Sequence, residues 1–133
     1  MMRNLHRAFF IVLLFVAAIQ APAMAMEMLE LRIEGAEGQA FSGDCVFQQK
    51  LGPAKRQRIS GSSPTRILFP AKTLQCNIQK SKIDGFFKVT ISRGNTVEII
   101  QNSRYPFKWI LVQSTGAWGD ARGSTHAARP TFR

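Results

Sequence analysis

The feature that most constrains the fold of this chain is a period-two alternation of apolar and polar residues, interrupted by turn residues about every eight to twelve positions. Leu29, Leu31 and Ile33, for example, alternate with charged residues, as the side chains of a half-buried strand do. No stretch after residue 26 shows a sustained helical period. The pattern predicts an all-β fold: a small antiparallel β-sandwich of immunoglobulin-like architecture with about seven strands.

The second half of the chain predicts a meander of four strands, at residues 74–81, 87–92, around 97–100 and 107–112. Asp84-Gly85 between the first two is a typical two-residue hairpin turn. In the third strand Val97 and Ile99 are expected on one face. In the last strand Phe107, Trp109 and Leu111 share one side, and core packing is the expected use of that side.

The chain has two cysteines, Cys45 and Cys76, each expected on the core face of its strand. An even pair in an oxidising compartment favours a disulfide bond. The alternative is a redox-active or metal-binding pair, which would favour a Cys-x-x-Cys spacing, whereas thirty residues separate these two. We therefore expect one structural disulfide, and we expect it to join strands of different sheets, as in immunoglobulin-like sandwiches.

Residues 1–25 have the three-part layout of a cleavable secretory signal. A short basic start precedes an unbroken apolar run over residues 8–19, and Ala23-Met24-Ala25 matches the small-x-small pattern of a cleavage site. The run of about a dozen apolar residues is shorter than the roughly 20 of a spanning helix, so no stable transmembrane span is expected. Retention of the segment as a membrane tether is the alternative.

Three parts are thus expected: the signal peptide at 1–25, a β-sandwich domain at 26–114, and a flexible basic tail at 115–133. The tail shows no alternation and is rich in Gly, Ala and Arg. No Asn-x-Ser/Thr acceptor site follows the signal, which points away from a glycosylated eukaryotic protein. A periplasmic or secreted location in a bacterium is the expected one.

The charge is unevenly distributed. The chain holds 18 Lys and Arg against 8 Asp and Glu, yet residues 27–44 hold five of the acids and one arginine. The stretch KLGPAKRQR contains four cations in a polar loop: Lys50, Lys55, Arg56 and Arg58. Such a loop suits anionic lipid or the phosphates of a glycan. The alternative is a solvated loop that keeps the protein soluble.

Two other segments are candidates for binding. Tyr105, Phe107 and Trp109 alternate with cations, a pattern that suits stacking on sugars or bases or contact with a membrane interface. Core packing of the last strand is the expected use of these aromatic side chains, and binding is the alternative. The tail, which carries Trp118 and Arg129, would be the second segment, as a docking arm or as plain disorder.

The sequence contains few residues that would support catalysis or bind a metal ion. His126 is the one histidine after the signal, and the carboxylates are scattered. Asp84 is explained by its turn, and Glu98 is expected to stand alone among apolar residues. We expect no catalytic residues, no metal and no cofactor, and therefore no enzyme. A hydrolase with paired carboxylates would require distant acids, such as Asp44 and Glu98, to come together in the fold, and nothing in their spacing favours such a pair.

The segments around the cysteines, Phe41-Ser42-Gly43-Asp44-Cys45 and Cys76-Asn77-Ile78-Gln79-Lys80 followed by Gly85, resemble those of small uncharacterised exported bacterial β-sandwich proteins. The resemblance covers residues 29–114 and implies the fold and the disulfide, with no function or site residues.

The sequence predicts a non-enzymatic exported binding protein of the bacterial cell envelope. Its expected partner is an anionic lipid or glycan surface that contacts the basic loop, or another envelope protein. In the second case it would act as a protein–protein accessory module that uses a sheet edge or the tail. Nucleic acid is not an expected partner outside the cell.

Overall fold

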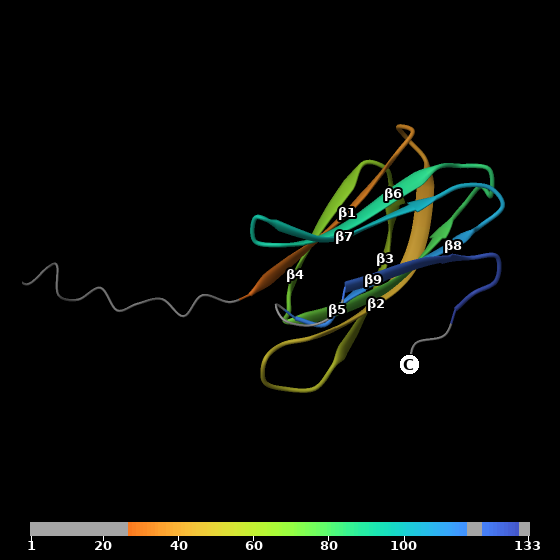
Figure 1. The fold of residues 1–133 in the computed structure, drawn as a ribbon. Coiled ribbons are helices and arrows are strands. Elements are labelled where there is room, and N and C mark those ends of the chain that lie inside the picture. The colour runs from red at the N-terminus through yellow and green to blue at the C-terminus, as the bar shows by residue number, and fades with distance from the viewer. Residues whose placement is uncertain (1–26, 117–120, 131–133) are drawn as a thin grey trace, which may run out of the picture.

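A computed structural model describes residues 27–116 and 121–130 of the chain. These residues form nine strands in two antiparallel sheets that pack face to face (Figure 1). The predicted all-β sandwich is thereby confirmed, with nine strands where about seven were expected. The expected signal peptide lies outside the described residues. Within those residues no helix has the length and apolar character that crossing a membrane requires.

The smaller sheet, sheet A, has the strand order β4-β1-β6-β7. Its strands are β1 (Met28–Gly35), β4 (Thr65–Pro70), β6 (Phe87–Arg93) and β7 (Thr96–Ser103). The larger sheet, sheet B, has the order β3-β2-β5-β8-β9. Its strands are β2 (Ala40–Gln48), β3 (Lys55–Ser62), β5 (Thr73–Lys80), β8 (Trp109–Ser114) and β9 (Ala121–His126). Strand β7 contacts β8 and β9 across the sandwich, so β3 and β4 lie at the opposite side, each at the edge of its sheet.

The strand directions sort the connections into two ends. The proximal end holds Glu27 and the connections at residues 49–54, 71–72 and 94–95. The distal end holds the connections at residues 36–39, 63–64, 81–86 and 104–108. Figure 1 shows the yellow β2–β3 loop at one end and the green β5–β6 and blue β7–β8 connections together at the other.

The core lies between the sheets and is made by the alternating apolar residues that the sequence predicts. Leu29, Leu31 and Ile33 of β1 are fully buried. The other fully or almost fully buried apolar side chains are those of Phe41, Cys45, Phe47, Ile59, Phe69, Ala71, Leu74, Cys76, Ile78, Phe87, Val89, Ile91, Ile110 and Val112. Both sheets contribute to this one cluster, so its burial stabilises their face-to-face packing.

The disulfide Cys45–Cys76 is present, but it does not join the two sheets. Cys45 on β2 and Cys76 on β5 are direct partners in neighbouring strands of sheet B, with 4.1 Å between their Cα atoms. The expectation of a cross-sheet bond is therefore wrong. The alternation places both side chains on the core face. It does not show whether their strands belong to opposite sheets or are neighbours in one sheet.

A bulge in β7 changes the predicted face of Val97. Ile91 pairs with Ile99 and Ser92 pairs with Val97, so Glu98 is the extra residue between two successive pairs. Val97 consequently turns to the outer face and is exposed, while Ile99 packs against the core. The bulge also redirects the side chain of Glu98.

The expected core side of β8 is wrong by one residue. Ile110 and Val112 are fully buried, whereas Trp109 and Leu111 lie half-buried on the outer face of sheet B. Phe107 precedes the strand and is exposed. Because the segment is apolar on both faces, its alternation did not identify the inward side.

The prediction of a flexible tail is wrong for residues 121–126, which form β9 and pair with β8 over its full length. The chain then returns across the outer face of sheet B. The Asn77 side chain donates a hydrogen bond to the Pro130 carbonyl (3.0 Å), and the Arg129 guanidinium lies 5.7 Å from the centre of the Trp109 ring. Trp118 lies outside the described residues.

Candidate functional site

The predicted basic loop lies at the proximal end and continues into the edge strand β3. Lys50, Lys55, Arg56 and Arg58 are all exposed, and we call these four residues the basic strip. Arg58 pairs in register with Asp44 of β2, so it lies on the outer face of sheet B. The sequence placed these cations in a loop, whereas the structure places three of them on a strand.

The acid nearest to the basic strip is Asp44. Its carboxylate is shared between Arg58, at 4.0 Å, and Arg129, at 3.2 Å. Among the described residues no acidic side chain forms an ion pair with Lys50 or Lys55. The strip therefore presents a surplus of positive charge at this edge.

Hydrogen bonds hold the loop that precedes the strip. The Gln48 side chain donates to the Gly52 carbonyl (2.9 Å), and the Lys72 backbone N–H donates to the Gln48 carbonyl (2.8 Å). Gly52 has a φ of +112°, a conformation that a side chain would oppose. The loop is thus tied to the β4–β5 connection, which is itself held by the network described next.

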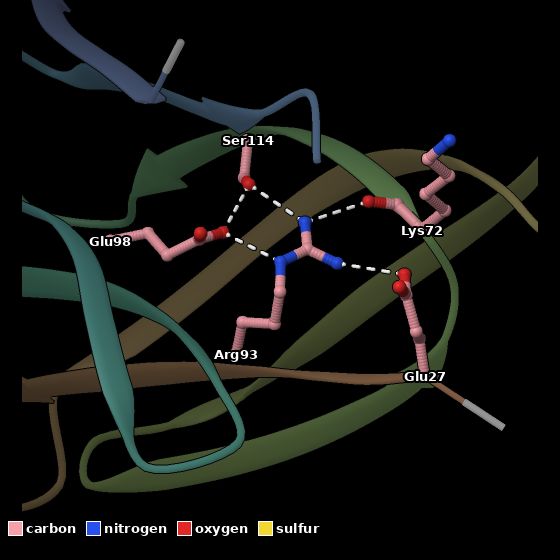
Figure 2. A network of polar contacts seen from close by, with 5 residues as sticks. All are labelled: Glu27, Lys72, Arg93, Glu98 and Ser114. Carbon is pink, nitrogen blue, oxygen red and sulfur yellow. Dashed lines mark hydrogen bonds and ion pairs between the residues drawn. The ribbon is translucent and has the colours of Figure 1, made fainter. Parts of the chain in front are cut away.

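A network of polar contacts around Arg93 holds the proximal end together (Figure 2). The guanidinium donates to the Glu98 carboxylate (3.2 Å), the Glu27 carboxylate (3.0 Å), the Lys72 carbonyl (2.7 Å) and the Ser114 hydroxyl (3.1 Å). The Ser114 hydroxyl in turn donates to Glu98. The network links β6 and β7 of sheet A to β8 of sheet B and to the support of the basic loop.

This network also changes the interpretation of Glu98, which was expected to stand alone. The Arg93 side chain is 13% exposed and neutralises a carboxylate of equal exposure. Glu98 accordingly accepts hydrogen bonds from Arg93 and Ser114 and forms a structural ion pair with Arg93. The spacing of Arg93 and Glu98 across the Gly94-Asn95 turn is the local signal that would have indicated this pair.

The predicted row of aromatic residues is divided by the structure. Tyr105 lies in the distal connection between β7 and β8, whereas Trp109 lies under Arg129 on sheet B. Tyr105 instead shares the lining of one hollow with Phe86, an aromatic residue of the neighbouring β5–β6 connection. These two side chains, with Asp84 and Arg104, line a shallow hollow that is wide open to solvent.

Lys80 was not predicted as a site residue, and it is fully buried at the distal end of β5. Its ammonium donates a hydrogen bond to the Gly85 carbonyl (2.6 Å), which holds the connection that carries Phe86. Burial lowers the pKa of Lys80 from its ordinary value of 10.5, and the negative charge of Asp84 opposes that shift. Lys80 is the last residue of β5, at the end of its apolar alternation. Because a lysine is not expected in a core, the sequence did not indicate that this side chain is buried.

The buried lysine leads to a prediction about alkaline pH. Since the pKa of Lys80 is lower in the folded state than the unfolded value of 10.5, the unfolded chain binds more protons between those two values. The contribution of Lys80 to the free energy of unfolding of the wild type should therefore rise with pH across that window. Lys80→Met removes this gain, so its stability relative to the wild type should fall as pH rises from neutral toward 10.5. Urea unfolding at several pH values measures this, with Lys82→Met as the exposed control.

Among the described residues no three His, Cys, Asp or Glu side chains come together in a way that would hold a metal ion. His126, on β9, is hydrogen-bonded to Ser124 at 2.7 Å. Asp44 and Glu98 have separate arginine partners, on β3 and the C-terminal segment for Asp44 and on β6 for Glu98.

No protein-family model, curated protein or solved structure matches this chain. The fold and the surface define the class instead: an antiparallel β-sandwich with an in-sheet disulfide and a cationic edge strand.

Proposed function

We propose that this protein is a non-enzymatic exported binding protein of the bacterial cell envelope, which contacts anionic surfaces through the basic strip. The observation that carries the proposal is the group of exposed cations on the edge strand β3 and the loop before it, with Lys50 and Lys55 unpaired by any described acid. The expected secretory signal at residues 1–25 and the resemblance to small exported bacterial β-sandwich proteins support the location.

The free energy of attraction expected from four cations is large enough for binding to an anionic surface. Each lysine or arginine close to an anionic membrane contributes about 1 kcal/mol, so four contribute about 4 kcal/mol. That corresponds to a roughly thousand-fold preference over an uncharged surface. Cations on an edge strand also discourage pairing with another chain, and this protective role is the competing explanation of the strip. Protection alone requires no anionic surface, so a binding measurement separates the two roles.

Replacement of Lys55, Arg56 and Arg58 with serine should abolish most of the binding to anionic vesicles. Loss of three contributions of about 1 kcal/mol predicts a decrease of about a hundred-fold in the partition coefficient. Co-sedimentation with phosphatidylglycerol vesicles measures it. The substitutions are at exposed positions, so the thermal midpoint should change little.

A charge-matched control replaces Arg32, Lys88 and Lys108 with serine, because these cations lie outside the strip. The control should retain binding, apart from a small loss from the lower net charge. Equal losses in the two triple variants would mean that net charge rather than the strip governs binding, and the site assignment would be wrong.

A second candidate function is a protein–protein accessory module. The observation that favours it is the edge of β4, which pairs only with β1 among the described strands and carries the exposed Leu68. An extended segment of another envelope protein would add to this edge by backbone hydrogen bonds. Partners recovered from the envelope that stay bound in high salt would favour this function over the first.

A further inference from the structure

The hollow at the distal end is a second candidate binding site, separate from the basic strip. Tyr105 is 68% exposed and Phe86 is 40% exposed, so two aromatic rings face solvent at neighbouring connections. The backbone N–H of Lys80 donates to the Lys108 carbonyl (3.0 Å), which ties the end of β5 to the β7–β8 connection. Large exposed aromatic side chains around a concavity are typical of ligand-binding surfaces.

Two polar side chains complete the lining of the hollow. Asp84 provides a carboxylate acceptor, and Arg104 provides a planar set of donors. The Arg104 guanidinium lies 5.5 Å from the centre of the Phe86 ring, which holds the donors beside an aromatic surface. A sugar ring has a matching division, with C–H groups on its faces and hydroxyls, which donate and accept, around its edge.

Other ligands fit the same residues less well. A cationic ligand would meet the like charge of the Arg104 guanidinium, which lies over the Phe86 ring. Insertion into an anionic bilayer would bring the Asp84 carboxylate to a surface of like charge, at a desolvation cost. A ligand with apolar faces and a neutral, hydroxylated edge can contact the exposed aromatic surface and also form hydrogen bonds with Asp84 and Arg104.

We propose that the distal hollow binds carbohydrate, with a sugar ring of an oligosaccharide stacked on the exposed ring of Tyr105 and its hydroxyls bonded to Asp84 and to Arg104, which the Phe86 ring positions. The site goes beyond the proposed contact with anionic surfaces and does not depend on the basic strip. A protein with both sites would hold a polysaccharide at its distal end while its proximal edge contacts negative charge.

The test is an NMR titration of the oxidised protein with three neutral probes: cellohexaose, chitohexaose and maltohexaose. At least one should shift amide signals of residues 81–86 and 104–108. Tyr105→Ala should weaken that binding about ten-fold, since an aromatic stacking contact is lost. Phe86→Ala should also weaken it, since the ring that positions Arg104 is removed. Tyr105→Phe keeps the ring and should bind nearly as well as the wild type.

Phe107→Ala is the matched control, because Phe107 is exposed in the same connection but does not line the hollow. It should bind like the wild type. Absence of localised shifts with all three probes would overturn the proposal. So would binding to neutral phosphatidylcholine vesicles that depends on Tyr105, because the rings would then be a membrane contact. The Lys55, Arg56 and Arg58 serine variant should bind the sugar normally, so failure of one site is distinguishable from failure of the other.

Discussion

Replacement of both Cys45 and Cys76 with alanine is expected to lower the free energy of unfolding by about 3–4 kcal/mol. The bond closes a loop of 31 residues, and restricting that loop in the unfolded chain gives this magnitude in the chain-entropy account. For a domain whose stability is about 5–15 kcal/mol the loss is large.

Urea unfolding followed by circular dichroism measures the loss. Reduction of the wild type with a phosphine is the control, because it removes the bond and keeps the sulfur atoms. The reduced wild type and the double alanine variant should both unfold at much lower urea concentration than the oxidised protein. Unchanged midpoints in both would show that the bond contributes little to stability.

Arg93→Met should lower the free energy of unfolding by about 2–4 kcal/mol. The substitution leaves the Glu98 carboxylate largely buried without its charged partner and removes the donor of the Lys72 carbonyl. Removal of one partner from a buried pair costs about 3–5 kcal/mol, and residual contact with water at this site reduces that figure. The network holds both sheets and the base of the basic loop, so binding to anionic vesicles should also weaken (Figure 2).

Arg32→Met is the matched control for this experiment. Arg32 pairs with Glu30 at 3.0 Å, but its side chain is 47% exposed, and such surface pairs contribute about 0–1 kcal/mol. Arg93→Lys should fall between the two, since an ammonium keeps the charge but cannot reach all four acceptors. If Arg93→Met and Arg32→Met destabilise equally, the network does not hold the proximal end.

The sequence predicted strands where apolar residues recur and missed β9, where they do not. β1, β2, β5 and β6 have one polar and one apolar face over most of their length, so their core residues were evident. β9 has the sequence ARGSTH, in which no apolar pattern exists. It forms a strand because β8 supplies its hydrogen-bonding partners, and such tertiary pairing is not encoded in local periodicity.

The site was predicted in part for a similar reason. The cations of the basic strip are neighbours in sequence, so composition alone located them. The partners of Arg93 are distributed from Glu27 to Ser114 and meet only after the sheets have packed. The hollow also depends on two connections brought together by β5 and β8, so Phe86 could not be associated with Tyr105 from spacing.

The central claim is that the basic strip makes the protein bind anionic envelope surfaces. Its most direct test is co-sedimentation of the oxidised mature protein with anionic and neutral vesicles at about 0.1 M and about 1 M salt, where the screening length falls from about 10 Å to about 3 Å. The account predicts binding to anionic vesicles at low salt, loss of that binding at high salt, and no binding to neutral vesicles. Absence of binding to anionic vesicles at low salt, or binding that high salt leaves unchanged, would contradict it.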